Sequence, residues 1–161
     1  MPGKHGPNSL KNYIAIHETV MDRFVRDGFV EHNGVTFQAF GAGLILIEGV
    51  ILCEGGLVCR AEKTLEVMGD ERDPQVQTIK YAYNVHLSGG GNLFRYDNVH
   101  VHPGLEDENH RHGFDLETGQ ETVTATGLEW PTLGEVLEEM RQWHWDHLDR
   151  APARPASPRP K

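Results

Sequence analysis

The alternating pattern of Val76–Leu87 constrains the fold more than any other stretch of the chain. One face is mostly apolar and the other is mostly polar. The apolar set consists of Ile79, Tyr81, Tyr83, Val85 and Leu87. A period of two residues is typical of a β-strand that packs one face against a core. Ser88–Asn92 is a glycine-rich turn, so we expect Leu93–Asn98 to return as an antiparallel neighbour.

Other segments extend this antiparallel sheet. Leu44–Cys53 and Leu57–Met68 are apolar stretches on either side of Glu54-Gly55-Gly56, which predicts a long hairpin. The alternation in Leu57–Met68 is imperfect, so we expect a β-bulge there. The remaining candidates are a strand at Val35–Phe40 after the Asn33-Gly34 turn, a strand at His110–Leu116, and a polar hairpin or loop at Thr118–Gly127.

A helix is expected at each end of the sheet-forming region. In Leu10–Arg26 the apolar residues recur at steps of three and four, and Gly28 is a stop signal. His17 falls on the apolar face, where we expect a core histidine rather than a ligand. Pro131-Thr132 opens a second amphipathic helix at Leu133–Leu148. This order predicts an α+β fold, in which a twisted antiparallel β-sheet meander carries an N-terminal and a C-terminal helix on one face.

The length of 161 residues predicts one domain with a sizeable core. We place a disordered N-terminus at residues 1–9, the single domain at residues 10–149 and a flexible Pro-rich tail at residues 150–161. No apolar run is long enough for a membrane helix and the N-terminus has no apolar signal core, so we expect a cytoplasmic protein without a membrane partner. Cys53 and Cys59 are therefore expected as reduced, buried thiols.

The net charge of −9 limits the kinds of partner. An acidic chain does not coat nucleic acid nonspecifically, because phosphate contacts need Lys and Arg side chains. Action on RNA would therefore need a local pocket or a basic partner protein.

Leu93–His112 has the highest density of side chains that hold or transfer protons near neutral pH. Alternation places Arg95 and Asp97 on one face of a strand and Tyr96 on the other, which we expect to be the core side. The pair His110 and His112 also shares a face. If the two strands are neighbours, these groups form a polar floor.

Metal-free acid–base chemistry on a phosphodiester is the first interpretation of this floor. RNA cleavage needs a base for the 2′-hydroxyl, an acid for the leaving oxygen and a cation for the phosphorane charge. Two histidines would act as acid and base, the arginine would stabilise the charge, and the aspartate would orient an imidazole. The candidate catalytic residues are Arg95, Tyr96, Asp97, His102, His110 and His112.

A divalent metal cofactor such as Zn²⁺ is the second interpretation. A His-x-His motif places two imidazoles on one side of a strand, and two such pairs can bind one metal ion. Oxygen ligands would come from Asp97 or from the acidic loop at Glu106-Asp107-Glu108. The candidate metal ligands are His100, His102, His110 and His112.

A non-enzymatic role is the third interpretation. In that case Asp97 and Asn98 cap a turn, and Arg95 pairs with Asp97. The histidines then belong to a loop that docks another protein. The residues alone leave the three interpretations open.

Several motifs resemble one known family. Arg95-Tyr96-Asp97-Asn98 is followed by His102-Pro103, a short loop and His110-x-His112. The other matching motifs are Ile47-Glu48-Gly49, Lys80-Tyr81-Ala82-Tyr83, and Pro131-Thr132-Leu133 followed by Glu135-Val136-Leu137. Over about Leu44–Trp143 the chain is similar to the TumE-like family of toxins from prokaryotic type II toxin–antitoxin modules.

The resemblance implies a small cytoplasmic toxin, a helix-turn-helix antitoxin as its partner, and an RNA-cleaving or translation-blocking role. Carried over position by position, it points to the same six candidate residues. We therefore predict a ribonuclease-type toxin without a metal cofactor, and we leave a homodimer open. Three features depart from the family pattern: the N-terminal forty residues, the acidic loop at Glu106-Asp107-Glu108 and the Pro-rich tail.

Overall fold

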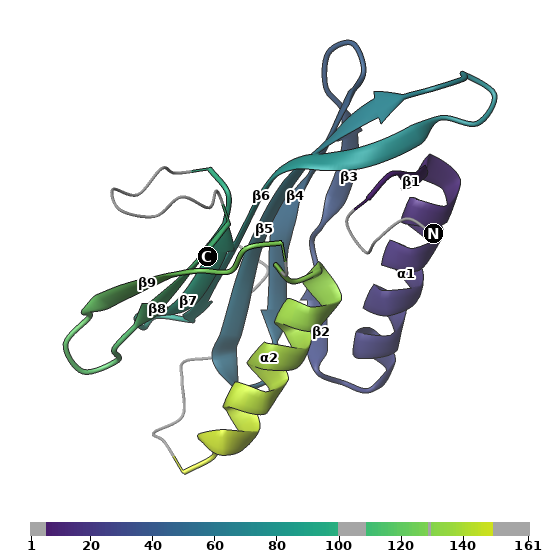
Figure 1. Ribbon diagram of the computed structural model, residues 1–161. Coiled ribbons are helices and arrows are strands. Elements are labelled where there is room, and N and C mark those ends of the chain that lie inside the picture. The colour runs from purple at the N-terminus through teal and green to yellow at the C-terminus, as the bar shows by residue number, and fades with distance from the viewer. Residues whose placement is uncertain (1–5, 100–108, 129, 150–161) are drawn as a thin grey trace.

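The computed structural model describes residues 6–99, 109–128 and 130–149 (Figure 1). Helices and strands alternate with short turns along most of this part of the chain. The elements are β1 (Asn8–Ser9), α1 (Leu10–Arg26), β2 (Val30–Asn33), β3 (Thr36–Ala39), β4 (Leu44–Cys53), a 3-10 turn (Glu54–Gly56), β5 (Leu57–Met68), β6 (Gln75–Leu87), β7 (Asn92–Asp97), β8 (His110–Phe114), β9 (Glu121–Ala125) and α2 (Leu133–Asp146).

The described strands form one antiparallel sheet in the order β2-β4-β5-β6-β7-β8-β9, with β1 on β6 and β3 on β4. From β4 to β9 each strand pairs with the next one along the chain, which is a meander. Both helices lie on one side of the sheet, α1 near β2 and α2 near β5 and β6 (Figure 1). The predicted α+β fold is therefore confirmed. Neither of these helices is long and apolar enough to cross a membrane.

The main core lies between the sheet and the helices. It joins Phe24 of α1 and Leu137 of α2 to sheet residues such as Ile51, Tyr83 and Phe94, all of which are fully or almost fully buried. The strand residues in this core alternate with polar ones, as expected for a sheet with one covered face. The opposite face of β4–β8 carries no helix among the described residues, and we call it the open face.

The helix ends follow their local sequence signals. The Ser9 hydroxyl accepts a hydrogen bond from the Asn12 N–H at 3.1 Å, and Gly28 has a φ of 86°, which glycine adopts without strain. At α2, Thr132 and Glu135 form a reciprocal capping box. His17 packs edge-on against the Phe37 ring, and burial lowers its pKa to about 4. This is the core histidine that its position in α1 predicts.

The two cysteines behave as the sequence predicts. Cys53 and Cys59 are free and buried on the helix-covered face. Burial raises the pKa of the Cys59 thiol to about 12, so the thiol stays protonated near neutral pH.

A β-bulge explains the main local difference from the predicted sheet. Thr64 pairs with Lys80 and Leu65 pairs with Thr78, so Ile79 is an extra residue on β6. A β-bulge was expected in Leu57–Met68, which is β5. The β5–β6 pairing does contain a bulge, but the inserted residue belongs to β6. The assignment of Ile79 to the core face is wrong, because the bulge leaves its side chain 44% exposed.

Two short strands were not predicted from the sequence. Asn8 and Ser9 form β1, at the end of the expected N-terminal tail, and pair with Val76 and Gln75. Val30–Asn33 forms β2 beside β4, where only Val30 is buried. Because the other three residues are polar and exposed, this strand has no clear periodic signal.

Candidate active site

The pairing of β7 with β8 brings most of the polar floor together. Arg95 lies opposite His112, and Asp97 lies opposite His110. Side chains alternate along a strand, so all four share one face. Phe94 and Tyr96 pack toward the core, so that face is the open face.

Asp97 is the centre of this cluster. Its side chain is fully buried, and its Oδ2 accepts a hydrogen bond from Arg95 Nε at 2.6 Å. His112 Nε2 lies 3.2 Å from the same oxygen. A buried carboxylate is stable only when charged or polar partners compensate for lost water, and these two side chains supply that compensation.

Glu121 completes the surroundings of His112. Its Oε1 lies 2.5 Å from His112 Nδ1, and its side chain is 45% exposed. The imidazole therefore lies between a buried carboxylate and a carboxylate at the surface. Sequence reasoning missed Glu121. The register of the β8–β9 pairing would identify it. Val123 lies opposite His112, and Glu121 is two residues from Val123, so Glu121 and His112 are on the same face of the sheet.

The candidate histidines differ in how the structure places them. His110 is fully buried beside Asp97, with Ala125 opposite on β9. His100, His102 and the acidic loop lie outside the described residues. Of the four candidate metal ligands, the structure therefore describes only His110 and His112. Within residues 6–99, 109–128 and 130–149, no group of three or more His, Cys, Asp or Glu side chains could hold a metal ion.

Tyr96 lies on the helix-covered face, away from Asp97 and His112. Its hydroxyl donates a hydrogen bond to Glu139 Oε1 of α2 at 2.6 Å and accepts one from Arg111 Nε at 3.1 Å. Arg111 also donates to Glu139 Oε2 at 2.7 Å. Burial and the bond to Glu139 raise the pKa of Tyr96 to about 12. These contacts tether α2 to β7 and β8.

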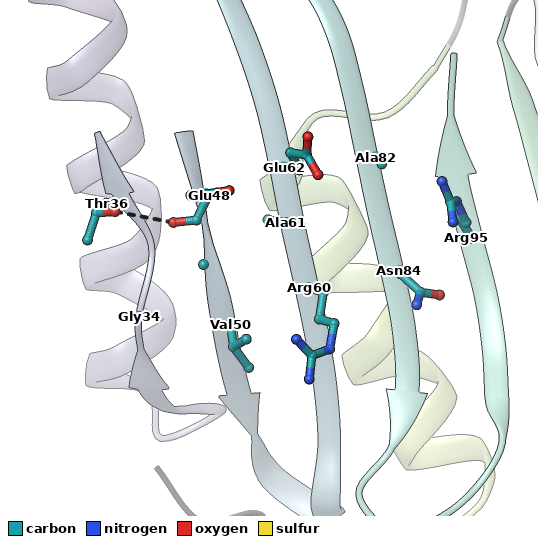
Figure 2. A pocket seen from close by; sticks show the side chains of 11 residues that line it. Gly34, Thr36, Glu48, Val50, Arg60, Ala61, Glu62, Ala82, Asn84 and Arg95 are labelled. Carbon is teal, nitrogen blue, oxygen red and sulfur yellow. Dashed lines mark hydrogen bonds between the residues drawn. The ribbon is translucent and has the colours of Figure 1, made fainter. Parts of the chain in front are cut away.

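An open groove continues from Arg95 across the open face (Figure 2). It has a volume of about 560 Å³ and runs over β4, β5, β6 and β7. Its polar lining includes Glu48, Arg60, Glu62, Asn84 and Arg95. Arg95 thus belongs both to the buried cluster and to a surface that a ligand can reach. Sequence reasoning missed Arg60 and Asn84, because their position beside Arg95 depends on strand register.

Comparison with known proteins gives one match. A family model described as Toxin TumE matches residues 18–144. The expectation that the N-terminal forty residues fall outside the family pattern is therefore wrong for residues 18–40, since the match begins within α1. No curated protein and no solved structure matches the chain significantly.

Proposed function

The chain belongs to the TumE toxin family, and we propose that it is the toxin of a type II toxin–antitoxin module that cleaves RNA by metal-independent acid–base chemistry. One observation carries the proposal. The buried Asp97 contacts both His112 and Arg95, and Arg95 lines an open groove. Two of the three kinds of group that phosphodiester cleavage needs are thereby adjacent.

The proposed reaction uses the 2′-hydroxyl of the RNA as nucleophile. A base removes its proton, the 2′-oxygen forms a bond to phosphorus, and the bond from phosphorus to the 5′-oxygen breaks. An acid protonates the leaving 5′-oxygen, and a cation stabilises the phosphorane between the two steps. The products are a 2′,3′-cyclic phosphate and a 5′-hydroxyl.

Arg95 is the proposed phosphate ligand. Among the described residues, Nε is the only Arg95 nitrogen that makes a hydrogen bond, and its partner is Asp97. A guanidinium has five N–H donors in a planar fork, so the terminal nitrogens stay available for a phosphate. The side chain is 30% exposed and lines the groove. Asp97 thus fixes the fork while the terminal nitrogens face the substrate.

His112 is the proposed proton carrier. An imidazole accepts and donates protons near neutral pH, and Glu121 fixes the orientation of this ring through Nδ1. Nε2 lies 3.2 Å from Asp97 Oδ2, and His112 pairs across the strands with Arg95, which lines the groove. We assign the second proton carrier to His110 or His102, and we assign Asp97 and Glu121 as positioning residues.

RNA cleavage by purified protein tests this proposal. We expect wild type to produce cyclic phosphate ends from total RNA, also in the presence of a chelator. His112→Ala and Arg95→Ala should each lower the rate by about 10²- to 10⁴-fold, the usual size of an acid–base contribution. Arg72→Ala is the matched control, because Arg72 is exposed in the turn between β5 and β6. Equal cleavage by wild type and His112→Ala, or none by either, contradicts the proposal.

The family membership also supports an antitoxin partner, for which we propose a cytoplasmic helix-turn-helix protein encoded beside the toxin. Co-expression of the adjacent reading frame should relieve the growth arrest that the toxin causes. If His112→Ala and Arg95→Ala arrest growth as strongly as wild type, the toxin acts by binding rather than by catalysis. Sedimentation of the purified toxin tests whether it forms a homodimer.

A further inference from the structure

The groove contains a row of polar side chains that ends at the candidate active site. Across β5, β6, β7 and β8 the paired positions are Arg60, Asn84, Arg95 and His112. Neighbouring strands lie about 4.8 Å apart, so the backbone of Arg60 is roughly 10 Å from that of Arg95. The row therefore extends the polar surface beyond Arg95 by roughly 10 Å, which is room for a further group of a bound ligand.

Arg60 is the outer cation of this row. It is exposed, and no carboxylate of the described residues lies within 4.0 Å of its guanidinium nitrogens. Figure 2 shows its side chain on the open face next to Asn84. An arginine without a protein anion, beside an amide that donates hydrogen bonds, is suited to a phosphate.

Two carboxylates form a second row along the groove. Glu48 of β4 lies directly opposite Glu62 of β5, and the next paired position on β6 is the small residue Ala82. Like charges opposite each other destabilise a sheet, and in the described residues neither carboxylate has a Lys, Arg or His within 4.0 Å. The pair costs stability without an ion-pair partner in the fold. A ligand that donates hydrogen bonds would offset this cost.

We propose that the groove binds one nucleotide of single-stranded RNA beside the scissile phosphate. Arg60 and Asn84 bind its phosphate, and the Glu48–Glu62 pair accepts a hydrogen bond from an exocyclic amino group of its base. The identity of the ligand rests on the proposed function. A volume of about 560 Å³ suits a ligand of this size. A protein of net charge −9 can hold RNA in this way, because only two arginines contact phosphates.

The phosphate half of the proposal is tested by the salt dependence of binding. Short 2′-O-methyl oligocytidine cannot be cleaved through its 2′-oxygen, so fluorescence anisotropy measures binding apart from catalysis. Two phosphate contacts predict a slope of about −1.4 for log K against log salt, and Arg60→Ala should reduce it to about −0.7. Arg72→Ala should keep the wild-type slope. An unchanged slope in Arg60→Ala overturns the proposal.

The base half is tested by comparing oligocytidine with oligouridine. Cytosine has an exocyclic amino group at C4, where uracil has a carbonyl oxygen, and uracil donates a hydrogen bond only through its ring N3–H. A glutamate placed opposite the C4 substituent therefore accepts a hydrogen bond from cytosine and faces the carbonyl oxygen of uracil. We expect cytidine to bind about tenfold more tightly, and Glu62→Gln to remove most of this preference. Glu66→Gln, exposed on the same strand, is the control. Equal binding of both oligomers to wild type overturns the base assignment.

These measurements separate the two proposals. Groove-dependent binding without cleavage of natural RNA supports the nucleotide site and contradicts the ribonuclease. Cleavage that Arg60→Ala and Glu62→Gln leave unchanged supports the ribonuclease and overturns the nucleotide site. Thermal unfolding of Glu62→Gln controls for misfolding, since removing one of two opposed charges should keep or raise the Tm.

Discussion

On each face of β7 and β8, one carboxylate contacts an arginine and a ring side chain, but the two clusters have different surroundings. On the open face, the buried carboxylate of Asp97 holds Arg95 and His112 next to a groove. On the helix-covered face, Glu139 holds Arg111 and Tyr96, and about a third of the Glu139 side chain is exposed. Both clusters combine a carboxylate with an arginine, although one contains a histidine and the other a tyrosine. The difference is that one ends at an open surface and the other ends at a helix.

The two faces also differ in the surroundings of their titratable side chains. Around the helix-covered core, burial favours the uncharged forms: it lowers the pKa of His17 to about 4 and that of Lys63 to about 8, and raises that of Cys59 to about 12. On the open face, Asp97 is paired with Arg95 and His112, whereas the groove also contains charged side chains without an ion-pair partner among the described residues. The sheet therefore separates groups used for packing from groups that can act on a ligand.

The largest expected effect comes from removing the central carboxylate of the open face. Asp97→Ala leaves Arg95 and His112 without their shared partner, so RNA cleavage should fall at least about 100-fold. The free energy of unfolding should fall by about 3 kcal/mol in urea titrations, as for other broken buried pairs. Glu139→Ala, the equivalent change on the other face, should cost about 1 kcal/mol and preserve cleavage. Equal loss of cleavage in both variants would remove the functional distinction between the faces.

The next effect concerns the orientation of His112. Glu121→Gln should lower kcat by about tenfold and leave KM unchanged, because Glu121 contacts the imidazole and does not line the groove. Steady-state cleavage of a short RNA measures both constants. Glu117→Gln, exposed in the turn before β9, is the matched control. A rise in KM with an unchanged kcat would instead place Glu121 in substrate binding.

A smaller effect is expected on the helix-covered face. Tyr96→Phe removes one hydrogen bond to Glu139 and one from Arg111, so the free energy of unfolding should fall by about 1 kcal/mol. The cleavage rate should stay within about twofold of wild type, because the hydroxyl faces away from Asp97. Urea titration and the RNA assay together measure this. A large loss of rate at unchanged stability would assign Tyr96 to catalysis.

The smallest effect is a pH dependence from His17. Its pKa is about 4 in the folded protein and near 6.5 when unfolded, so the unfolded state binds more protons between these values. Stability from this residue is present above pH 6.5 and is lost as the pH falls toward 4. Because His17 is partly exposed, we expect a loss below about 1 kcal/mol. His17→Phe should flatten the stability curve in this range, and an equally steep curve would contradict the assignment.

Local signals predicted most of the fold. The bounds of α1, β4 and β5 agree with their predicted ranges, because apolar periodicity and glycine turns mark their ends. Alternation also placed Arg95 and Asp97 together and Tyr96 on the core side. The misplacement of Ile79 has a physical cause, since a single inserted residue reverses the faces on one side of the bulge.

The parts of the site that depend on register could not be predicted in the same way. Arg60, Asn84 and Glu121 meet the central cluster only through the cross-strand register of neighbouring strands. No short motif marks these residues. The motifs of the family resemblance, which lie on β4, β6, β7, β8 and α2, include none of the three.

The meander order has a consequence for how the molecule folds. Each of β5 to β8 pairs with the next strand along the chain, so Asp97, His112 and Glu121 meet through consecutive antiparallel pairings. Closing a hairpin costs less chain entropy than bringing distant segments together, and low contact order favours fast formation. α1 contacts β1 and β2, which are its neighbours along the chain, and also β6, which is far from it in the sequence. The cluster around Asp97 therefore forms from contacts between consecutive strands, whereas the packing of α1 on β6 joins segments far apart in the sequence.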